Sequence, residues 1–478
     1  MDKPIKNICC IGAGYVGGPT MAVIADKCPE IQVNVVDINH NRIKDWNVEN
    51  LNKLPIFEPG LDEIIGRCRN KNLHFSKEVK EHISKADMIF ISVNTPTKKK
   101  GLGAGKASDL KWVEASAREV AEYAQGHTIV VEKSTIPVRT AEVIESILKS
   151  KQESFEKNLI TKSFDVLSNP EFLAEGTAVN DLLFPERILI GGNNKIAINA
   201  LSEIYKHWVP ESRILKTNVW SSELAKLTAN AFLAQRISSI NSISALCEST
   251  GADVREVARA IGTDSRIGSK FLDSGPGFGG SCFKKDILNL VYLSEYFGLP
   301  EVANFWNGVV ELNNWHQNRI SELITKKLFG TLSGKKINVL GFSFKANTND
   351  TRESAAIQIC KQLIDEGANL YIHDPKVNPK QIASDLNLQD LKDGHNLLKN
   401  KSFSNSGSWQ FMEKLDNFDG AHAVVILTEW QENSNLDWVK VASQMVNTAW
   451  VFDARSIIEP VKVKNAGLKL WRIGDGSI

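Results

Sequence analysis

One cysteine of this chain stands in a setting that could make its thiol a nucleophile. Cys282 lies in the stretch GFGGSCFKKD, behind a run of glycines and ahead of Lys284 and Lys285. The residues that follow, KKDILNLVYL, have the pattern of the first turns of a helix. A helix N-terminus beside lysines favours the thiolate form, and a glycine run lets a ligand approach the backbone closely. We therefore predict that Cys282 is catalytic.

The other six cysteines have no comparable setting. They are scattered at positions 9, 10, 28, 68, 247 and 360, mostly among apolar neighbours, and no CxxC pair occurs. The pattern indicates neither a zinc site nor a disulfide framework, so we expect no metal and a reducing compartment. Small buried hydrophobic residues are a sufficient interpretation of these six.

Lys226 and Asn230 are the next candidates, because a spacing of four residues puts them on one face of a helix. Together they offer donors for an oxyanion, and a desolvated lysine can also act as a base. The alternative is that both are ordinary solvated side chains. Leu224, Leu227 and Phe232 favour a largely buried helix, in which a lysine and an asparagine would need polar partners.

Two glutamates follow an apolar run that has the pattern of a strand. Glu171 and Glu175 lie in NPEFLAEG (169–176), at the end of the run FDVLSN. Ligands of doubly wound sheets bind outside the carboxyl ends of the strands. These carboxylates are therefore candidates for a ligand site, although an ordinary acidic loop would have the same sequence pattern.

The N-terminal stretch predicts a dinucleotide site. Gly12, Gly14 and Gly17 form GxGxxG between an apolar strand and a helix, and Asp37 ends the next strand. The first glycine permits a tight turn, the second lets a pyrophosphate approach, and the third lets the helix pack on the strand. Asp37 would accept hydrogen bonds from ribose hydroxyls and repel a 2′-phosphate, which favours NAD over NADP. The nearby Arg42 leaves NADP open.

The elements that must position these residues alternate between strands and helices. Helical patterns separate several of six apolar runs, at 7–11, 32–37, 87–93, 127–133, 164–169 and 187–192. This alternation predicts a parallel, doubly wound sheet. A long helical stretch follows at 221–251, and the strand–helix rhythm returns from 335. The predicted fold class is α/β, with two Rossmann-like parallel-sheet domains joined by a long central helix and a helical connector. The polar segment 379–416 is expected to be rich in loops.

The composition is that of a globular protein without a strong charge bias. The 478 residues carry a net charge of +1, with 42% hydrophobic and 24% charged residues. This balance gives no electrostatic case for nucleic acid or an anionic membrane, and no apolar run approaches the ~18 residues of a membrane helix. The start of the chain superficially resembles a signal peptide, but its glycine spacing argues against one. We expect a cytoplasmic protein of two or three domains.

Taken together, these motifs resemble those of the UDP-glucose 6-dehydrogenases, within the nucleotide-sugar 6-dehydrogenase family. The matching stretches occur in family order over nearly the whole chain: GAGYVGGPT, VNTPT, EKSTIPV, NPEFLAEGTA, ELAKLTANAFLA, RIGSKFL, GFGGSCFKKD and FKANTNDTRES. The resemblance implies an NAD-dependent four-electron oxidation of UDP-glucose to UDP-glucuronate. It would use two NAD and one water and pass through a thiohemiacetal and a thioester on the cysteine.

The resemblance also implies roles for individual residues. The implied catalytic set is Cys282 as nucleophile, Lys226, Asn230 and Asp286 as its assistants, Glu171 as the acid–base residue of the hydrolytic step, and Thr135 to orient water or cofactor. Substrate contacts are implied for Glu171, Glu175, Lys226, Asn230, Arg266, Phe271, Phe278, Gly279, Phe344, Lys345 and Arg455. Cofactor contacts are implied for Gly12, Gly14, Tyr15, Val16, Gly17, Asp37, Arg42, Thr95, Ser134, Glu175, Lys285 and Arg352.

The resemblance further implies three domains and an oligomer. An NAD-binding Rossmann domain would occupy 1–218, a central helical dimerisation domain with the cysteine loop 219–330, and a UDP-sugar-binding α/β domain 331–478. In the family, the residue that matches Arg266 reaches a neighbouring subunit's site, which implies a homo-oligomer of at least two subunits, with a hexamer among the candidates. The chain departs from animal members at Ser274-Gly-Pro, and at Ala346-Asn347, where they carry charges.

Other classes of protein remain open at this point. A two-electron hydroxyacid or phosphogluconate-type dehydrogenase on the same scaffold would use Lys226 and Asn230 and leave Cys282 structural. A dinucleotide-binding scaffold without activity is a second alternative. Within the family, GDP-mannose and UDP-N-acetylmannosamine dehydrogenases share the cysteine loop. The C-x-x-K-D run at 282–286 fits the UDP-glucose and GDP-mannose branches better.

Overall fold

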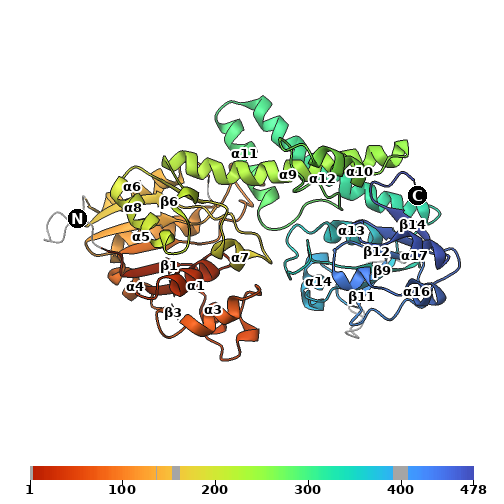
Figure 1. Ribbon diagram of the computed structural model, residues 1–478, viewed down its shortest axis with the longest axis horizontal. Helices are drawn as coiled ribbons and strands as arrows, with labels where there is room; N and C mark the ends of the chain where they lie inside the picture. Colours follow the sequence, from red (N-terminus) through yellow and green to blue (C-terminus); the bar gives the residue numbers. More distant parts are fainter. Residues whose placement is uncertain (1–3, 136, 153–161, 391–406, 478) are drawn as a thin grey trace. The chain divides into compact units, whose positions relative to one another are not determined.

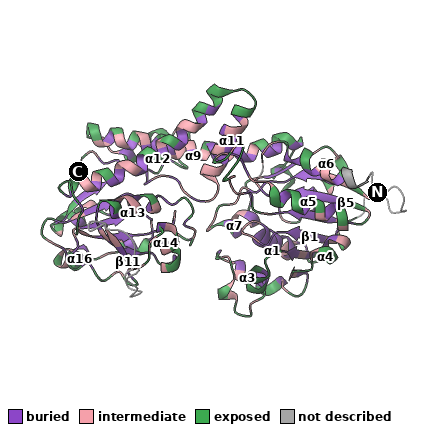
Figure 2. Cartoon of the chain, turned by 180° about the vertical axis from the view of Figure 1, so that it is seen from behind, coloured by how far each residue is buried: buried purple, intermediate pink, exposed green. Residues whose placement is uncertain are grey.

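The structure is a computed structural model, which describes residues 4–135, 137–152, 162–390 and 407–477. The chain forms two compact units, Met1–Ala229 with Leu288–Leu299 and Asn230–Ile287 with Pro300–Ile478. Each unit contains one β-sheet (Figure 1). The strands of both sheets are largely buried, as the purple ribbons of Figure 2 show.

The first unit is built on an eight-stranded sheet. Its order is β3 (Leu73–Ser76), β2 (Gln32–Val36), β1 (Asn7–Ile11), β4 (Met88–Ile91), β5 (His127–Glu132), β6 (Ser163–Ser168), β7 (Ile188–Gly192) and β8 (Ile214–Thr217). The strands from β3 to β6 run parallel, β7 joins β6 antiparallel, and β8 is parallel to β7. The strand order reverses between β1 and β4, and doubly wound sheets bind their ligands at such a point.

Helices cover both faces of this sheet. One core contains residues of α1 (Gly17–Lys27), α3 (Leu61–Cys68) and α8 (Lys195–Lys206), and the other contains residues of α4 (Val79–Lys85), α5 (Lys111–Tyr123) and α6 (Thr140–Gln152). Shorter helices lie at α2 (His40–Trp46), α7 (Ala178–Leu183), η1 (Leu51–Lys53) and η2 (Glu211–Arg213).

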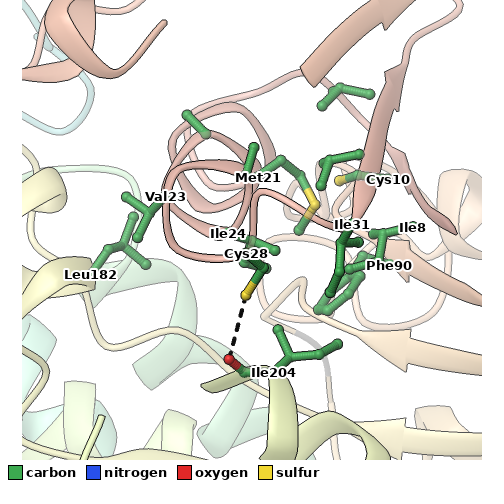
Figure 3. Packing of buried hydrophobic residues seen from close by; sticks show 14 of the residues in the cluster. Ile8, Cys10, Met21, Val23, Ile24, Cys28, Ile31, Phe90, Leu182 and Ile204 are labelled. Atoms are coloured by element: carbon green, nitrogen blue, oxygen red, sulfur yellow. Dashed lines mark hydrogen bonds between the residues drawn. The ribbon is translucent and has the colours of Figure 1, made fainter. Parts of the chain in front are cut away.

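Alternate residues of β1 serve the two cores, as expected for a strand covered on both sides. Ile8 and Cys10 belong to the core beneath α1, whereas Cys9 and Ile11 belong to the core beneath α5. Figure 3 shows the first of these cores from close by. There the Cys28 thiol donates a hydrogen bond to the Ile204 carbonyl, with Sγ and O 3.7 Å apart.

The second unit is built on a six-stranded sheet in which every neighbouring pair is parallel. Its order is β11 (Ser408–Phe411), β10 (Asn369–His373), β9 (Lys336–Leu340), β12 (Ala423–Ile426), β13 (Trp450–Asp453) and β14 (Lys469–Arg472). One core packs α12 (Pro300–Lys327), α13 (Ala355–Asp365) and α14 (Pro379–Leu386), and the other packs α16 (Trp438–Gln444) and α17 (Pro460–Asn465). This unit also contains the shorter helices α10 (Val254–Gly262) and α15 (Gln431–Ser434).

Two helices belong partly to each unit. Helix α9 (Val219–Thr250) passes from the first unit into the second, and α11 (Phe283–Tyr296) begins in the second and continues into the first. The two predicted Rossmann-like α/β sheets and the long helix that follows the first of them in the sequence are confirmed. The prediction of parallel strands fails at one pair, because β7 joins β6 antiparallel. The predicted three-domain division stays a prediction.

Three expectations from the sequence need correction. The segment 379–416 contains α14 and β11 within its described part, and 391–406 lies outside the described residues. Four short strands, β3, β8, β11 and β14, were not predicted from the sequence. Helix α9 is not largely buried: Leu227 is buried, but Leu224 is 42% and Phe232 56% exposed, because only part of its surface packs against its own chain.

Across the ranges that the structure describes, no helix combines the length and the apolar character needed to cross a membrane.

Candidate active site

The dinucleotide motif forms the turn from β1 into α1. At Gly12 φ is +110° and an added Cβ would lie 2.3 Å from the Ser92 carbonyl oxygen, so no larger residue fits. At Gly17 an added Cβ would lie 2.1 Å from the Gly12 carbonyl oxygen, so α1 packs tightly on the strand. A Cβ on Gly14 would have no atom within 4 Å. This open backbone, just before the start of α1, fits a dinucleotide pyrophosphate.

Asp37 follows β2 and is fixed by the backbone. Its Oδ2 accepts a hydrogen bond from the Ala13 N–H (3.0 Å) and its Oδ1 from the Asn39 N–H (2.8 Å). Arg42 pairs with the same carboxylate, with Nη1 3.4 Å from Oδ2. Because Arg42 pairs with Asp37, the arrangement favours a ribose with free hydroxyls over a 2′-phosphate.

The loop after β6 is tied to the dinucleotide turn. Glu58, which sequence reasoning missed, is buried and accepts hydrogen bonds from the N–H groups of Gly176 (2.5 Å) and Ala178 (2.9 Å). The Tyr15 hydroxyl accepts a further one from Gly176 (3.2 Å). These bonds hold the loop segment that carries Glu175, which is half-buried. Val16 directly precedes α1.

The loops after β4 and β5 are joined by side-chain hydrogen bonds. The Thr95 hydroxyl donates to the Thr135 carbonyl at 2.7 Å, and the Ser134 hydroxyl donates to the Val93 carbonyl at 2.7 Å. Thr95 and Ser134, both candidates for cofactor contacts, are buried. The loop after β4 therefore fixes the backbone at Ser134 and Thr135.

The buried Glu171 and Lys226 form a cluster with the half-buried Thr135 in the first unit. Glu171 and Lys226 are only 6% and 4% exposed, and the Lys226 Nζ lies 3.5 Å from the Glu171 Oε1. The Thr135 hydroxyl donates to the same oxygen at 3.3 Å, and Lys226 also lies over the Phe172 ring, 5.4 Å from its centre. The other carboxylate oxygen, Oε2, is buried without a hydrogen-bond partner among the described residues. The cluster therefore presents an acceptor that a ligand could use.

The second unit holds the cysteine loop. Cys282 directly precedes α11, and its carbonyl accepts the Asp286 N–H at 2.8 Å in the first turn. Its Sγ lies 3.4 Å from the Ser281 hydroxyl oxygen. Cys282 is partly exposed, whereas the other six cysteines are buried. Burial raises the thiol pKa of these six, which keeps them protonated: Cys9, Cys10, Cys28, Cys68, Cys247 and Cys360.

Asn230 of α9 is hydrogen-bonded to Asp286, which lies in the first turn of α11 after Cys282. The Asn230 Nδ2 donates to the Asp286 Oδ2 at 2.6 Å, and both side chains are buried. The Lys285 Nζ lies 3.8 Å from the Asp286 Oδ1. Lys226 and Asn230 both lie on α9, one helical turn apart, as their spacing in the sequence predicted. What it missed was that each has a carboxylate partner.

The glycine loop before Cys282 is held by α9 and α12. The Asn241 Oδ1 accepts from the Gly275 N–H at 3.0 Å, and the Asn313 Oδ1 accepts from the Phe278 N–H at 2.9 Å. His316 lies 2.9 Å from the Gly275 carbonyl through Nε2. Burial, with a contribution from Arg319, lowers the pKa of His316 to about 3, so the ring is neutral and Nε2–H donates to that carbonyl.

The second sheet closes the other side of this loop. An added Cβ on Gly279 would lie 2.5 Å from the Glu353 carbonyl oxygen, and one on Gly280 would lie 3.2 Å from the Phe344 ring. The Arg455 Nη2 donates to the Phe344 carbonyl at 2.8 Å. Phe344 thus lies against the loop, and its neighbour Lys345 has its Nζ 5.6 Å from the ring centre.

Three further candidates lie towards the surface of the second unit. Arg266 pairs with Asp264 (2.6 Å), and its side chain is 87% exposed. Phe271 adopts a positive φ of 63° and is 39% exposed. Arg352 pairs with Asp350 (2.6 Å), while its carbonyl accepts the Gly280 N–H at 2.8 Å.

The structure therefore divides the candidate residues between the two units. The first unit contains Gly12, Gly14, Tyr15, Val16, Gly17, Asp37, Arg42, Thr95, Ser134, Thr135, Glu171, Glu175 and Lys226. The second contains Asn230, Arg266, Phe271, Phe278, Gly279, Cys282, Lys285, Asp286, Phe344, Lys345, Arg352 and Arg455.

The sheet order, the glycine turn and the acidic residue after β2 are those of a dinucleotide-binding dehydrogenase domain. The chain belongs to the UDP-glucose/GDP-mannose dehydrogenase family. Residues 6–209 match the family's NAD binding domain, 220–315 its central domain, and 338–460 its UDP binding domain.

Named relatives agree with this family over nearly the full length. The chain is 53% identical over 472 residues to UDP-glucose 6-dehydrogenase from Drosophila melanogaster, which covers 98% of this chain and 96% of the relative. It is 52% identical over 477 residues to UDP-glucose 6-dehydrogenase 3 from Oryza sativa subsp. japonica, covering 98% and 97%. The solved UDP-glucose dehydrogenase from Pyrobaculum islandicum superposes with a TM-score of 0.81 at 29% identity, covering 98% of each chain.

Proposed function

We propose that this chain is an NAD-dependent enzyme that oxidises UDP-glucose to UDP-glucuronate, a four-electron reaction that uses two NAD and one water. The observation that carries the proposal is the setting of Cys282, a partly exposed thiol at the start of a helix, in a chain whose other cysteines are buried. The names of the relatives at 52–53% identity support UDP-glucose as the substrate.

NAD would be held by the glycine turn and by Asp37. The other residues listed below would make further contacts with it. Once bound, NAD supplies the acceptor for each two-electron oxidation. The proposed contacts are Gly12, Gly14, Tyr15, Val16, Gly17, Asp37, Arg42, Thr95, Ser134, Glu175, Lys285 and Arg352.

Cys282 explains how one enzyme can oxidise an alcohol twice. An ordinary alcohol dehydrogenase can stop at the aldehyde, because the second oxidation needs a tetrahedral carbon that bears oxygen. The Cys282 thiolate adds to the aldehyde carbon, forming a C–S bond and an alkoxide that is protonated to a thiohemiacetal. The second oxidation turns this adduct into a thioester. The covalent bond also prevents a reactive aldehyde from escaping.

Lys226 and Asn230 are proposed to stabilise the oxyanion formed in this addition. Loss of one such donor costs about 3 kcal/mol, or roughly a hundredfold in rate. Each group has a carboxylate partner that orients it: Glu171 for Lys226 and Asp286 for Asn230. Asp286 would therefore assist catalysis by fixing the amide.

Glu171 is proposed to activate the water that hydrolyses the thioester. Its buried Oε2 lacks a hydrogen-bond partner among the described residues, so it can accept a proton. Water attacks the thioester carbon and passes its proton to Glu171; the C–S bond then breaks and Cys282 leaves as thiolate. Thr135, which donates to the Glu171 Oε1, would orient the carboxylate or the water.

The nucleotide sugar is proposed to contact the glycine loop and the second sheet. Lys345 and Arg455 supply positive charge that suits a diphosphate, and the absence of a side chain at Gly279 lets the loop pack closely against the Glu353 backbone beside Phe344. The proposed contacts are Glu171, Glu175, Lys226, Asn230, Arg266, Phe271, Phe278, Gly279, Phe344, Lys345 and Arg455.

A homo-oligomer is proposed from exposed apolar side chains on the long helices. Large apolar residues are between 36% and 59% exposed on α9 (Trp220, Leu224, Phe232, Ile243 and Leu246) and on α12 (Val302, Phe305 and Trp315). Such side chains are typical of protein–protein contact. Arg266, whose side chain is 87% exposed, would reach a neighbouring subunit's site.

The domain division and the compartment are also proposals. Residues 1–218 would bind NAD, 219–330 would form the central dimerisation domain, and 331–478 would bind the UDP-sugar. A reducing compartment, the cytoplasm, suits a reaction that depends on Cys282 staying in its reduced form.

A panel of nucleotide sugars tests the substrate. With NAD in excess, we expect kcat/KM for UDP-glucose to exceed that for GDP-mannose and UDP-N-acetylmannosamine by at least about 100-fold, because buried polar groups reject an ill-matched ligand. NADH absorbance provides the measurement. A higher value for GDP-mannose would place the chain in the other branch of its family.

A further inference from the structure

Three side chains of the types that bind transition metals lie together in the first unit. Cys28 directly follows α1, Glu30 lies two residues further on, and His207 directly follows α8. The Cys28 Sγ, a carboxylate oxygen of Glu30 and a ring nitrogen of His207 all lie within 4.8 Å of one another. The part of the chain that the structure describes contains no second group of three such side chains at this spacing.

A tight turn fixes the first two of these side chains. The Cys28 carbonyl accepts a hydrogen bond from the Ile31 N–H at 3.0 Å, and Pro29 is the second residue of the turn, where its ring fixes φ. The buried Asn72 donates through Nδ2 to the carbonyls of both Cys28 (3.4 Å) and Ile31 (3.2 Å). The backbone therefore holds Cys28 and Glu30 in a defined relation to each other.

The His207 ring is oriented as metal-binding histidines are. Its Nδ1 lies 2.9 Å from the Glu203 carbonyl oxygen and 3.1 Å from that of Ile204. Because a carbonyl can only accept, Nδ1 carries the proton, and the lone pair of the neutral ring is at Nε2. Nε2 lies 3.3 Å from the Glu30 Oε1. Two ligands at about 2.0–2.1 Å from one tetrahedral zinc ion are themselves about 3.3 Å apart.

The sulfur lies behind the two other ligands. The side chains of Glu30 and His207 are 59% and 42% exposed, whereas Cys28 is fully buried. Its thiol lies at the Ile204 carbonyl of α8, 3.7 Å from the oxygen (Figure 3). An ion that arrives from solvent would therefore meet Glu30 and His207 first and the sulfur next.

We propose that Cys28, Glu30 and His207 bind one Zn²⁺ ion, with water as the fourth ligand. A thiolate and an imidazole select Zn²⁺ over Mg²⁺ and Ca²⁺, which prefer oxygen ligands, and a carboxylate is a common third ligand of zinc. As the zinc–sulfur bond forms, the Cys28 thiol releases its proton to solvent. The bound ion would join the C-terminal ends of α1 and α8.

This site is separate from the dinucleotide turn and does not rest on the proposed function. The turn lies at the N-terminus of α1, and Cys28 lies beyond the other end of this 11-residue helix, which is about 16 Å long. The expectation of no metal came from the spacing of the cysteines alone. It could not include a site whose ligands come from two distant segments.

Calorimetric titration of the full-length Cys282→Ala chain with ZnCl₂ tests the proposal, because this background lacks the partly exposed thiol that could bind zinc by itself. We expect one ion per chain with a micromolar or lower dissociation constant. Cys28→Ser and His207→Gln, each added to this background, should weaken binding at least about 100-fold, since loss of even an outer partner of a ligand costs about 10- to 100-fold. His207→Gln changes an exposed side chain and serves if Cys28→Ser does not fold.

Cys68→Ser in the same background is the matched control. Cys68 is also a buried cysteine of the first unit beside a carboxylate, with its Sγ 3.9 Å from the Asp26 Oδ1, but it belongs to no group of three potential ligands among the described residues. Its substitution should leave zinc affinity unchanged.

Cobalt(II) in place of zinc identifies the ligands without any turnover. With CoCl₂, the Cys282→Ala chain should show the visible bands of a tetrahedral ion and a near-ultraviolet thiolate-to-cobalt band. The thiolate band should disappear in Cys28→Ser and persist in Cys68→Ser. Absence of stoichiometric zinc binding, or equal zinc affinity in Cys28→Ser and His207→Gln, would overturn the proposal and leave Glu30 and His207 a surface ion pair over a buried cysteine.

Discussion

Cys282→Ala should reduce formation of UDP-glucuronate at least about 1,000-fold, the largest effect expected from a single substitution in this chain. Without the sulfur no C–S bond can form, so neither the thiohemiacetal nor the thioester exists. Binding should persist, because the loop that carries Cys282 is held by bonds from Asn241, Asn313 and Arg352 that the substitution does not touch. Product formation by chromatography, with NAD and UDP-glucose affinities by calorimetry, measures both effects.

A second cysteine in the same unit provides the control. Cys360 of α13 is fully buried, and burial raises the pKa of its thiol, so Cys360→Ala should cost some stability and leave kcat close to that of the unaltered chain. If Cys282→Ala kept more than about a tenth of the product rate, Cys282 would be a structural residue. The two-electron dehydrogenase would then be the better interpretation.

Glu171→Gln should stop the reaction at the thioester, lowering kcat by roughly 100- to 10,000-fold. Glutamine keeps the size of the side chain and an oxygen for the Thr135 hydroxyl, but it cannot take a proton from water. The first turnover should therefore release a rapid burst of two NADH per site before the rate falls. Stopped-flow absorbance records the burst, and intact-mass spectrometry should find the chain carrying the acyl group on Cys282.

The double variant Cys282→Ala/Glu171→Gln isolates the covalent step. It lacks the sulfur, so it should show neither the two-NADH burst nor the gain in mass. A burst of one NADH in Glu171→Gln would mean that Glu171 acts before the second oxidation. Full steady-state activity in Glu171→Gln would remove Glu171 from the mechanism.

The parts of the site that the sequence predicted are those defined by local geometry. Gly12 and Gly17 are required because a Cβ at either position would clash with a backbone carbonyl of the turn or of the neighbouring Ser92. Cys282 lies between a run of glycines and the start of a helix, and both patterns are visible in the sequence. Lys226 and Asn230 share a helix, so their spacing was sufficient to put them together. The two α/β sheets followed from the alternation of apolar runs with helical patterns.

The parts that the sequence could not predict depend on contacts between distant segments. Glu58 holds a loop that lies more than a hundred positions along the chain, and Asn313 binds the cysteine loop from another helix. Lys133 lies in the matching stretch EKSTIPV, yet its hydrogen-bond partners Asn169 and Tyr205 lie far along the chain. Exposure of Phe232 and Leu224 also escaped prediction, since a pattern of apolar residues does not reveal which surface a second chain would cover.

The number of NADH formed per UDP-glucose tests the central claim, that Cys282 links two oxidations, most directly. Limiting UDP-glucose is incubated with excess NAD until absorbance stops rising, and the sugar products are separated and counted. Two NADH and one UDP-glucuronate for each UDP-glucose is the predicted result. One NADH with the aldehyde as the end product would contradict the covalent four-electron mechanism.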